Sequence, residues 1–109
     1  MTNQETKAGN VLIAYSPFSG KDVETNIEHY ADSGNEIGLQ LYLDGLKYHS
    51  DWNSLMGVVE KIEEIGFDVK ISTNYTSISN YNPIVQEFGG KKIEVVFQAV
   101  VKYIEWHNA

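Results

Sequence analysis

The chain has 109 residues, of which 42% are hydrophobic and 12% aromatic, enough apolar material for one globular domain with an ordered core. It contains no cysteine, so disulfides, thiolate metal sites and cysteine nucleophiles are excluded. Fifteen acidic residues against eight basic ones give a formal charge of −7, which disfavours a nucleic-acid partner.

The acidic residues are interspersed with lysines along the chain, and this favours a solubilising surface over one that imitates DNA. No apolar run near the start of the chain is long enough for a signal peptide or a membrane span. We therefore expect a cytoplasmic protein with no membrane partner. The polar residues 1–8 are expected to be a disordered tail of a single domain that spans residues 1–109.

The first third of the chain gives mixed signals. The apolar run Val11–Tyr15 fits either a buried strand or one face of a short helix, and the pattern leaves both open. Residues 16–35 are polar and contain glycine and serine, so we expect a loop-rich segment there. Within it, residues 22–30 have a capping residue and apolar positions at the spacing of a short helix.

The middle of the chain predicts a strand followed by a helix. Apolar residues occupy every second position from 37 to 43, which is typical of a strand with one buried face, and Asp44-Gly45 then predicts a turn. Apolar residues recur at helical spacing from Trp52 to Ile62. We expect this helix to begin at Ser50 or Asp51 and to end at Gly66 with a left-handed cap.

Two strands and a long helix follow. Residues 67–71 alternate in polarity, and residues 75–81 are rich in Tyr, Thr and Ile, which predicts two strands, the second ending at Asn82-Pro83. Gly89-Gly90 precedes a helix from about residue 92 to residue 107. The expected fold is α+β and sandwich-like, with a small antiparallel sheet of three to four strands between residues 37 and 81, packed by two or three helices.

The last helix has an unusually narrow polar face. Its polar side chains fall within about 80° of its circumference, and the remainder is apolar. Such a helix is buried on several sides, either by a multilayered fold or by a second subunit. We expect a homo-oligomer whose interface includes Val95, Ala99, Val101, Tyr103 and Trp106.

Two segments carry a family resemblance: residues 46–63, which begin LKYHSDWN, and residues 92–108, KIEVVFQAVVKYIEWHN. They resemble small uncharacterised proteins of Bacteroidota phages, prophages and mobile elements, a family similar in layout to the phage alpha-beta-alpha sandwich domain. The resemblance covers a little over half of the chain, from about Ile37 onward. It implies that Val11–Tyr15 belongs to a first helix, and it implies no catalytic residue.

The chain departs from this family at two positions and over one segment. Ser54 and Gly57 stand where the family more often has Trp and Pro, and the residues before Ile37 match poorly. Any specialised role is therefore expected in the N-terminal third.

The most concentrated polar and aromatic group stands at the start of the predicted middle helix. Free backbone amides and the helix dipole favour anions there, so a phosphate or nucleotide could bind. The alternative is that these residues only cap the helix and staple its entry. The candidate ligand-binding residues are Tyr48, His49, Ser50, Asp51, Trp52 and Asn53.

Other sites find little support in the sequence. His29, His49 and His107 show no metal-binding spacing, no G-x-S-x-G elbow exists, and Ser19-Gly20-Lys21 lacks the other residues of a P-loop. We therefore expect no metal, no cofactor and no enzyme. A group of aromatic residues could stack on a base or a partner, or could simply be half-buried: Tyr15, Phe18, Tyr30, Tyr42, Tyr48, Tyr75 and Tyr81.

These observations favour a binding function. The leading hypothesis is a non-enzymatic phage-type accessory or anti-defence protein that binds a small host molecule, such as a cyclic nucleotide immune signal. The alternative is a protein-interaction inhibitor or acidic decoy of a host enzyme.

Overall fold

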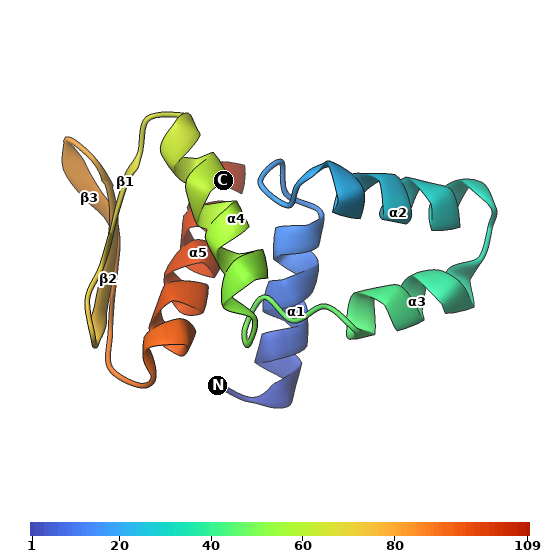
Figure 1. Cartoon of the computed structure of the whole chain (residues 1–109), viewed down its shortest axis with the longest axis horizontal. Coiled ribbons are helices and arrows are strands. Elements are labelled where there is room, and N and C mark those ends of the chain that lie inside the picture. Colours follow the sequence, from blue (N-terminus) through green and yellow to red (C-terminus); the bar gives the residue numbers. More distant parts are fainter.

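The computed structural model describes all 109 residues as five helices and a three-stranded antiparallel sheet (Figure 1). This confirms the predicted α+β class. No helix has the length and apolar character needed to cross a membrane. The elements in chain order are α1 (Asn3–Ala14), α2 (Lys21–Asp32), α3 (Glu36–Asp44), α4 (Trp52–Glu64), β1 (Asp68–Ile71), β2 (Tyr75–Asn80), β3 (Asn82–Phe88) and α5 (Lys92–Asn108).

The sheet is a meander in the order β1-β2-β3. Gly66 follows α4 with a φ of 103°, a conformation that favours glycine, and lets β1 begin two residues later, as the sequence predicts. The third strand, β3, is not predicted from the sequence, because Asn82-Pro83 indicates only the end of the preceding strand. Pro83 is tolerated since β3 is an edge strand and the register shifts between Ile78 and Ser79, opposite Pro83.

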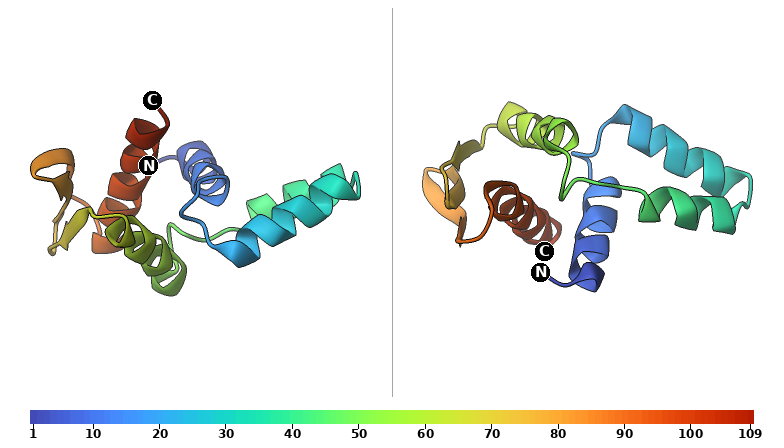
Figure 2. Two further views of the ribbon diagram at one scale, coloured as in Figure 1. Left: turned by 90° about the horizontal axis from the view of Figure 1, so that it is seen from above. Right: turned by 60° about the horizontal axis from the view of Figure 1, so that its bottom comes forward.

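Helix α5 is the centre of the molecule and is covered on several sides, as its narrow polar face predicts. It lies between the sheet, which it contacts through β2 and β3, and helix α1, with α4 packed alongside (Figures 1 and 2). Its cover thus comes from the same chain. Of the five residues expected at an oligomer interface, Val95, Ala99 and Tyr103 have no exposed surface. Val101 is partly buried, and Trp106 is about half exposed. The homo-oligomer stays a prediction, and α5 does not require it.

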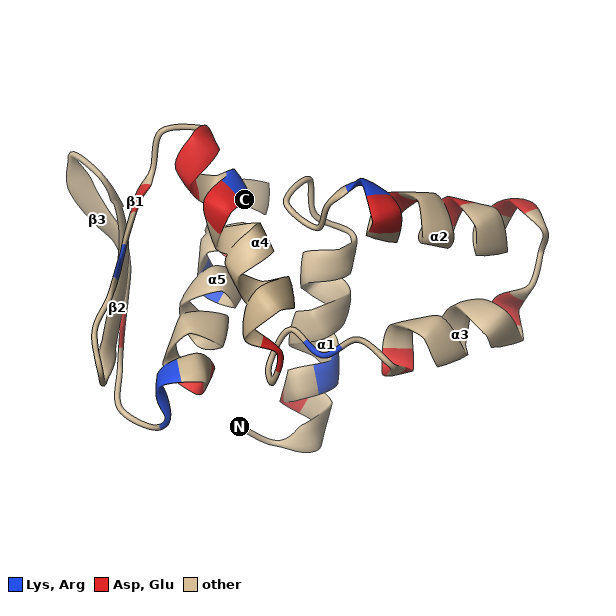
Figure 3. Cartoon of the chain, in the orientation of Figure 1, with Lys and Arg blue, Asp and Glu red and all other residues tan.

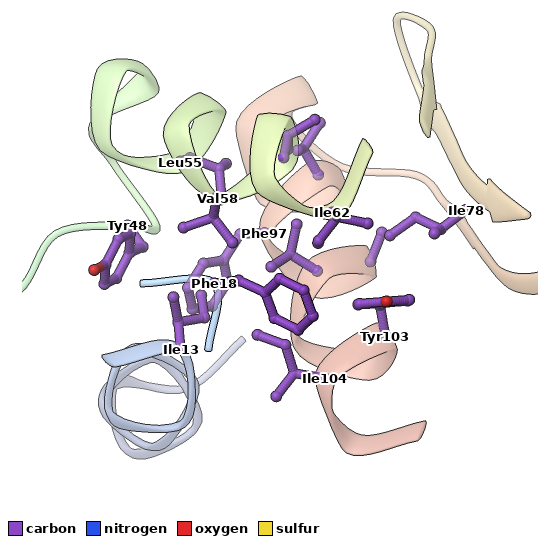
Figure 4. Packing of buried hydrophobic residues seen from close by; sticks show 14 of the residues in the cluster. Ile13, Phe18, Tyr48, Leu55, Val58, Ile62, Ile78, Phe97, Tyr103 and Ile104 are labelled. Atoms are coloured by element: carbon purple, nitrogen blue, oxygen red, sulfur yellow. The ribbon is translucent and has the colours of Figure 1, made fainter. Parts of the chain in front are cut away.

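The core is formed where α1, α4, α5 and the sheet meet (Figure 4). Aromatic rings contact edge to face at its centre: the ring of Tyr103 lies 5.5 Å from that of Phe18 and 5.0 Å from that of Phe67. Helix α1 approaches α5 at Gly9, where a Cβ atom would lie only 2.7 Å from Cζ of Phe97. The absence of a side chain at Gly9 therefore permits this contact.

Helix α1 begins earlier than the sequence suggests. Residues 1–8 were expected to be a disordered tail, but α1 begins at Asn3. Thr2 and Glu5 form a capping box, in which the Thr2 hydroxyl accepts from the Glu5 amide and the Glu5 carboxylate accepts from the Thr2 amide. The helix continues to Ala14, so most of Val11–Tyr15 is helical, as the family resemblance implies.

The predicted strand at residues 37–43 is wrong, because this segment is helix α3. Leucine is a good helix former, and Asn35 caps the helix by accepting a hydrogen bond from the Gly38 amide at 2.9 Å. The apolar residues also satisfy a helical pattern, since Leu39, Tyr42 and Leu43 are the half-buried ones. The sheet therefore lies within residues 68–88 and not between 37 and 81.

Helices α2 and α3 form an antiparallel hairpin, residues 21–44, that projects from the rest of the molecule (Figures 1 and 2); we refer to it as the arm. The arm is joined internally by Tyr30, whose ring packs over Gly38 and lies 5.8 Å from that of Tyr42. It meets the body through contacts of α3 with α1. The radius of gyration, 14.1 Å, exceeds the value of about 13 Å expected for a compact chain of this length.

Candidate functional site

The six candidate ligand-binding residues do not form one surface. Ser50 lies exposed in the turn before α4, and Asn53 is exposed in the first turn of the helix. Trp52 is 39% exposed at the first position of α4, whereas Tyr48 is buried. The side chains of Tyr48 and His49 point in different directions, because Tyr48 lies near residues 19–23 and His49 contacts Asn10.

The N-terminus of α4 is occupied by its own cap. One carboxylate oxygen of Asp51 accepts a hydrogen bond from the Asn53 amide at 3.0 Å, and the other accepts from the Ser54 hydroxyl at 3.2 Å. The negative charge of Asp51 thus sits where an anionic ligand would have to bind. The geometry favours the capping interpretation of this segment over the ligand-binding one.

His49 faces helix α1. Its Nδ1 atom lies 2.9 Å from Nδ2 of Asn10, and its ring meets that of Phe97 edge to face. His29 lies in the arm and His107 at the end of α5, where it packs against Phe18. The three histidines are therefore in three separate places, and no group of His, Asp and Glu in the chain is arranged to hold a metal ion.

Tyr48 lines a hollow at the base of the arm. The hollow has a volume of about 330 Å³ and is lined by residues 19–23, Tyr48 and Ser54. The Tyr48 side chain is 4% exposed, with its ring against the core and its hydroxyl directed away from the core (Figure 4). Burial, with a smaller effect of Tyr42, raises the pKa of Tyr48 to about 12, so the hydroxyl is a protonated donor at neutral pH.

The other aromatic residues singled out in the sequence do not gather on one face. Tyr30 and Tyr42 pack together in the arm, whereas Tyr75 packs on Phe88 in the sheet, at the opposite end of the molecule (Figure 1). Tyr81 is fully exposed between β2 and β3. A continuous tyrosine surface for stacking is therefore absent.

The arm carries most of the net charge of the protein (Figure 3). It has six carboxylates and one lysine, giving −5 of the total −7. The interpretation that acidic residues are interspersed with lysines holds for the body but fails for the arm. The signal was present in the sequence, because no lysine occurs between Lys21 and Lys47. The six carboxylates belong to Asp22, Glu24, Glu28, Asp32, Glu36 and Asp44.

The arm also exposes apolar side chains. Ile37 is 77% exposed and Leu41 is 68% exposed, and because they are four residues apart they share one face of α3. Neither α2 nor α3 contains a buried residue. The predicted strand at residues 37–43 would place Ile37 and Leu41 on the buried side of a sheet, so the sequence pattern does not indicate this exposed face.

A further hollow of about 420 Å³ lies between α1, β3 and α5. It is lined by Met1, Glu5, Glu87 and Lys102, among others, and Lys102 forms an ion pair with Glu87 at 2.5 Å. Its one lysine is thus paired, and the carboxylates of Glu5 and Glu105 form no ion pair, so the hollow offers no free lysine to an anion.

Comparison with known proteins gave no match to a family model, to a curated protein or to a solved structure. The resemblance to proteins of Bacteroidota phages and mobile elements therefore stays a prediction.

Proposed function

We propose that this chain is a non-enzymatic interaction protein that presents its arm to another protein. The observation that carries the proposal is that residues 21–44 contribute no buried residue to the fold. Ordering a residue costs about 1–2 kcal/mol, and isolated helices of this length are marginal in water. A segment that is ordered but adds little to the core is well explained by a partner that it contacts.

The chemistry of the arm defines the partner. A net charge of −5 attracts a basic surface and repels an acidic one, so a second copy of the arm is disfavoured. Ile37 and Leu41 would supply apolar contacts within the charged interface. The proposed partner surface is basic, with an apolar depression that accepts these two side chains.

The arrangement of carboxylates on α2 suits a decoy. Glu24, Glu28 and Asp32 recur at every fourth position, which places them on one face of the helix, about 6 Å apart along its axis. Such a row could occupy a basic groove that normally receives a nucleic acid. Together with the resemblance to phage proteins, this supports the role of an inhibitor or acidic decoy of a host enzyme.

A pull-down with matched variants tests the apolar part of the interface. Wild-type protein, a variant with Ile37→Ser and Leu41→Ser, and the control Ile65→Ser would each be immobilised and exposed to lysate of a Bacteroidota host. Ile65 is an exposed apolar residue of the body, 55% exposed. We expect one stoichiometric partner that the wild type and the control retain and the arm variant loses. Equal retention by all three proteins would refute the proposal.

A second pair of variants tests the charges. Glu24→Gln with Glu28→Gln removes two charges from the arm, and Glu63→Gln with Glu64→Gln removes two exposed charges from α4. We expect the first pair to slow association with the captured partner and to reduce its salt dependence. The second pair should change neither, and equal effects of both pairs would show that only the total charge matters.

Sequestration of a small host molecule is a second candidate function. The hollow beside Tyr48 favours it, because a buried side chain there offers a free hydroxyl. Thermal melts with cyclic dinucleotides and cyclic ADP-ribose isomers test it, since a ligand that binds only the folded state raises the melting temperature. No shift with any of these compounds would argue against this role.

A further inference from the structure

The start of α2 lines the hollow beside Tyr48 and has free backbone donors. Helix α2 has 12 residues, and Gly20 at its N-cap provides no side-chain hydrogen bond. The amides of Lys21, Asp22 and Val23 have no partner among the backbone hydrogen bonds of the chain. These amides and the positive end of the helix dipole attract an anion.

The Tyr48 hydroxyl is an independent feature of the same hollow. Tyrosine hydroxyls form hydrogen bonds within the chain at Tyr42, which accepts from Asn26, and at Tyr75, which accepts from Gln86. The hydroxyl of Tyr48 forms none, although the residue is 4% exposed and lines the hollow. The ring is enclosed but the hydroxyl stays open to the hollow, so it is a donor without a partner in the chain that a ligand atom can fill.

Two lysines stand beside the hollow. Lys21 lines it, and Cε of Lys61 lies 3.7 Å from the place that a Cβ on Gly20 would occupy. The ion pair of Lys102 with Glu87 is the only one in the chain, so neither of these lysines is paired. The Asp22 carboxylate also lines the hollow and opposes an anion, but the two lysines and the helix dipole outweigh it.

We propose that this hollow binds the phosphate group of a small phosphorylated molecule. The amides of residues 21–23 and the Tyr48 hydroxyl supply neutral donors at this space, and Lys21 supplies charge. The site differs from the one predicted at the start of α4, which Asp51 occupies. The proposal deepens the second candidate function and is independent of a partner at the arm.

Titration of the full chain with inorganic phosphate, followed by amide NMR at constant ionic strength, tests the proposal. We expect saturable shifts of the Lys21, Asp22 and Val23 amides with a Kd on the order of 1 mM. Tyr48→Phe removes only the hydroxyl and should raise the Kd about tenfold, the usual effect of losing a hydrogen bond to a charged group. Tyr81→Phe, at a fully exposed tyrosine between β2 and β3, should leave it unchanged.

Lys21→Gln provides a second variant at an exposed position, and it should also weaken phosphate binding. Shifts that fail to saturate, or a Tyr48→Phe variant that binds phosphate like the wild type, would overturn the proposal. The result is separable from the sequestering role. One outcome is that phosphate binds at this hollow while no cyclic nucleotide shifts the melting temperature. That result would support the phosphate site and exclude only the tested cyclic nucleotides as its ligands.

Discussion

Replacing Gly9 by alanine tests the packing of α1 on α5, the contact on which the centre of the molecule depends. The new Cβ would lie 2.7 Å from Cζ of Phe97 and 3.0 Å from Cγ2 of Val101. Ordinary carbon contacts are about 3.5–4.0 Å, so the Phe97 ring must retreat by roughly 1 Å. Phe97 is 1% exposed and packs within the core, so a ring that retreats displaces its neighbours as well.

The expected loss follows from two opposing terms. Overpacking a core costs about 1–3 kcal/mol, and alanine gains about 1 kcal/mol over glycine within a helix. We expect Gly9→Ala to lower the free energy of unfolding by about 1 kcal/mol, which corresponds to a melting temperature about 4–8 °C lower. Urea unfolding should show a lower midpoint with an unchanged slope, because the area exposed on unfolding is nearly the same.

Gly57 is the matched control. It lies within helix α4, and a Cβ there would meet no atom within 4 Å. Gly57→Ala should therefore raise the free energy of unfolding by about 0.5–1 kcal/mol through helix propensity alone. If Gly9→Ala also stabilises the protein, α1 does not approach α5 as closely as the structure has it, and the packing described above is wrong.

Three further predictions concern single side chains. Tyr103→Phe removes a buried hydroxyl that has no hydrogen-bond partner and should raise the urea midpoint, by about 1 kcal/mol in free energy; a lower midpoint would mean that the hydroxyl is satisfied. Burial raises the pKa of Tyr103 above 10 and, with Tyr42, that of Tyr48 to about 12, so the folded chain keeps protons that the unfolded chain releases. The contribution of these tyrosines to the free energy of unfolding should be fully present below pH 10 and should decrease as the pH rises above 10. Urea midpoints that do not change between pH 9 and pH 11.5 would contradict this. Asp51→Ala removes the cap of α4 and should cost about 1 kcal/mol in thermal or urea unfolding, whereas an unchanged stability would show that the cap contributes nothing.

The α4–β1–β2 region could be predicted from the sequence because its signals are local and agree with one another. Asp51 at the N-cap, a regular apolar face and Gly66 at the end define α4, and alternation then defines β1. The strand prediction for residues 37–43 is wrong because most positions there are apolar, and such a run fits a helical pattern and a strand pattern equally well. The helix propensity of leucine and the Asn35 cap decide between them.

The candidate site was located only in part. The sequence indicates Tyr48 only as a member of the group before α4, because adjacency in sequence does not show that its side chain faces another way than that of His49. The partners of Tyr48 in the hollow, residues 19–23, are distant in sequence, and the incomplete P-loop pattern at Ser19-Gly20-Lys21 assigns them no role. The run without lysine indicates that residues 21–44 are acidic, but the sequence does not indicate that this arm projects from the body.

The apolar pattern of residues 92–108 is enough to require that α5 be enclosed, because a helix with an apolar surface around most of its circumference is unstable in water. Whether the enclosure comes from a second copy or from the chain was decided by tertiary structure, which places α1, α4 and the sheet around α5. The same holds for the arm. The local pattern predicts a loop-rich segment at residues 16–35, where the structure has α2, and a strand at residues 37–43, where it has α3. The projection of the arm from the body depends on which faces find partners at a distance, and no local pattern records that.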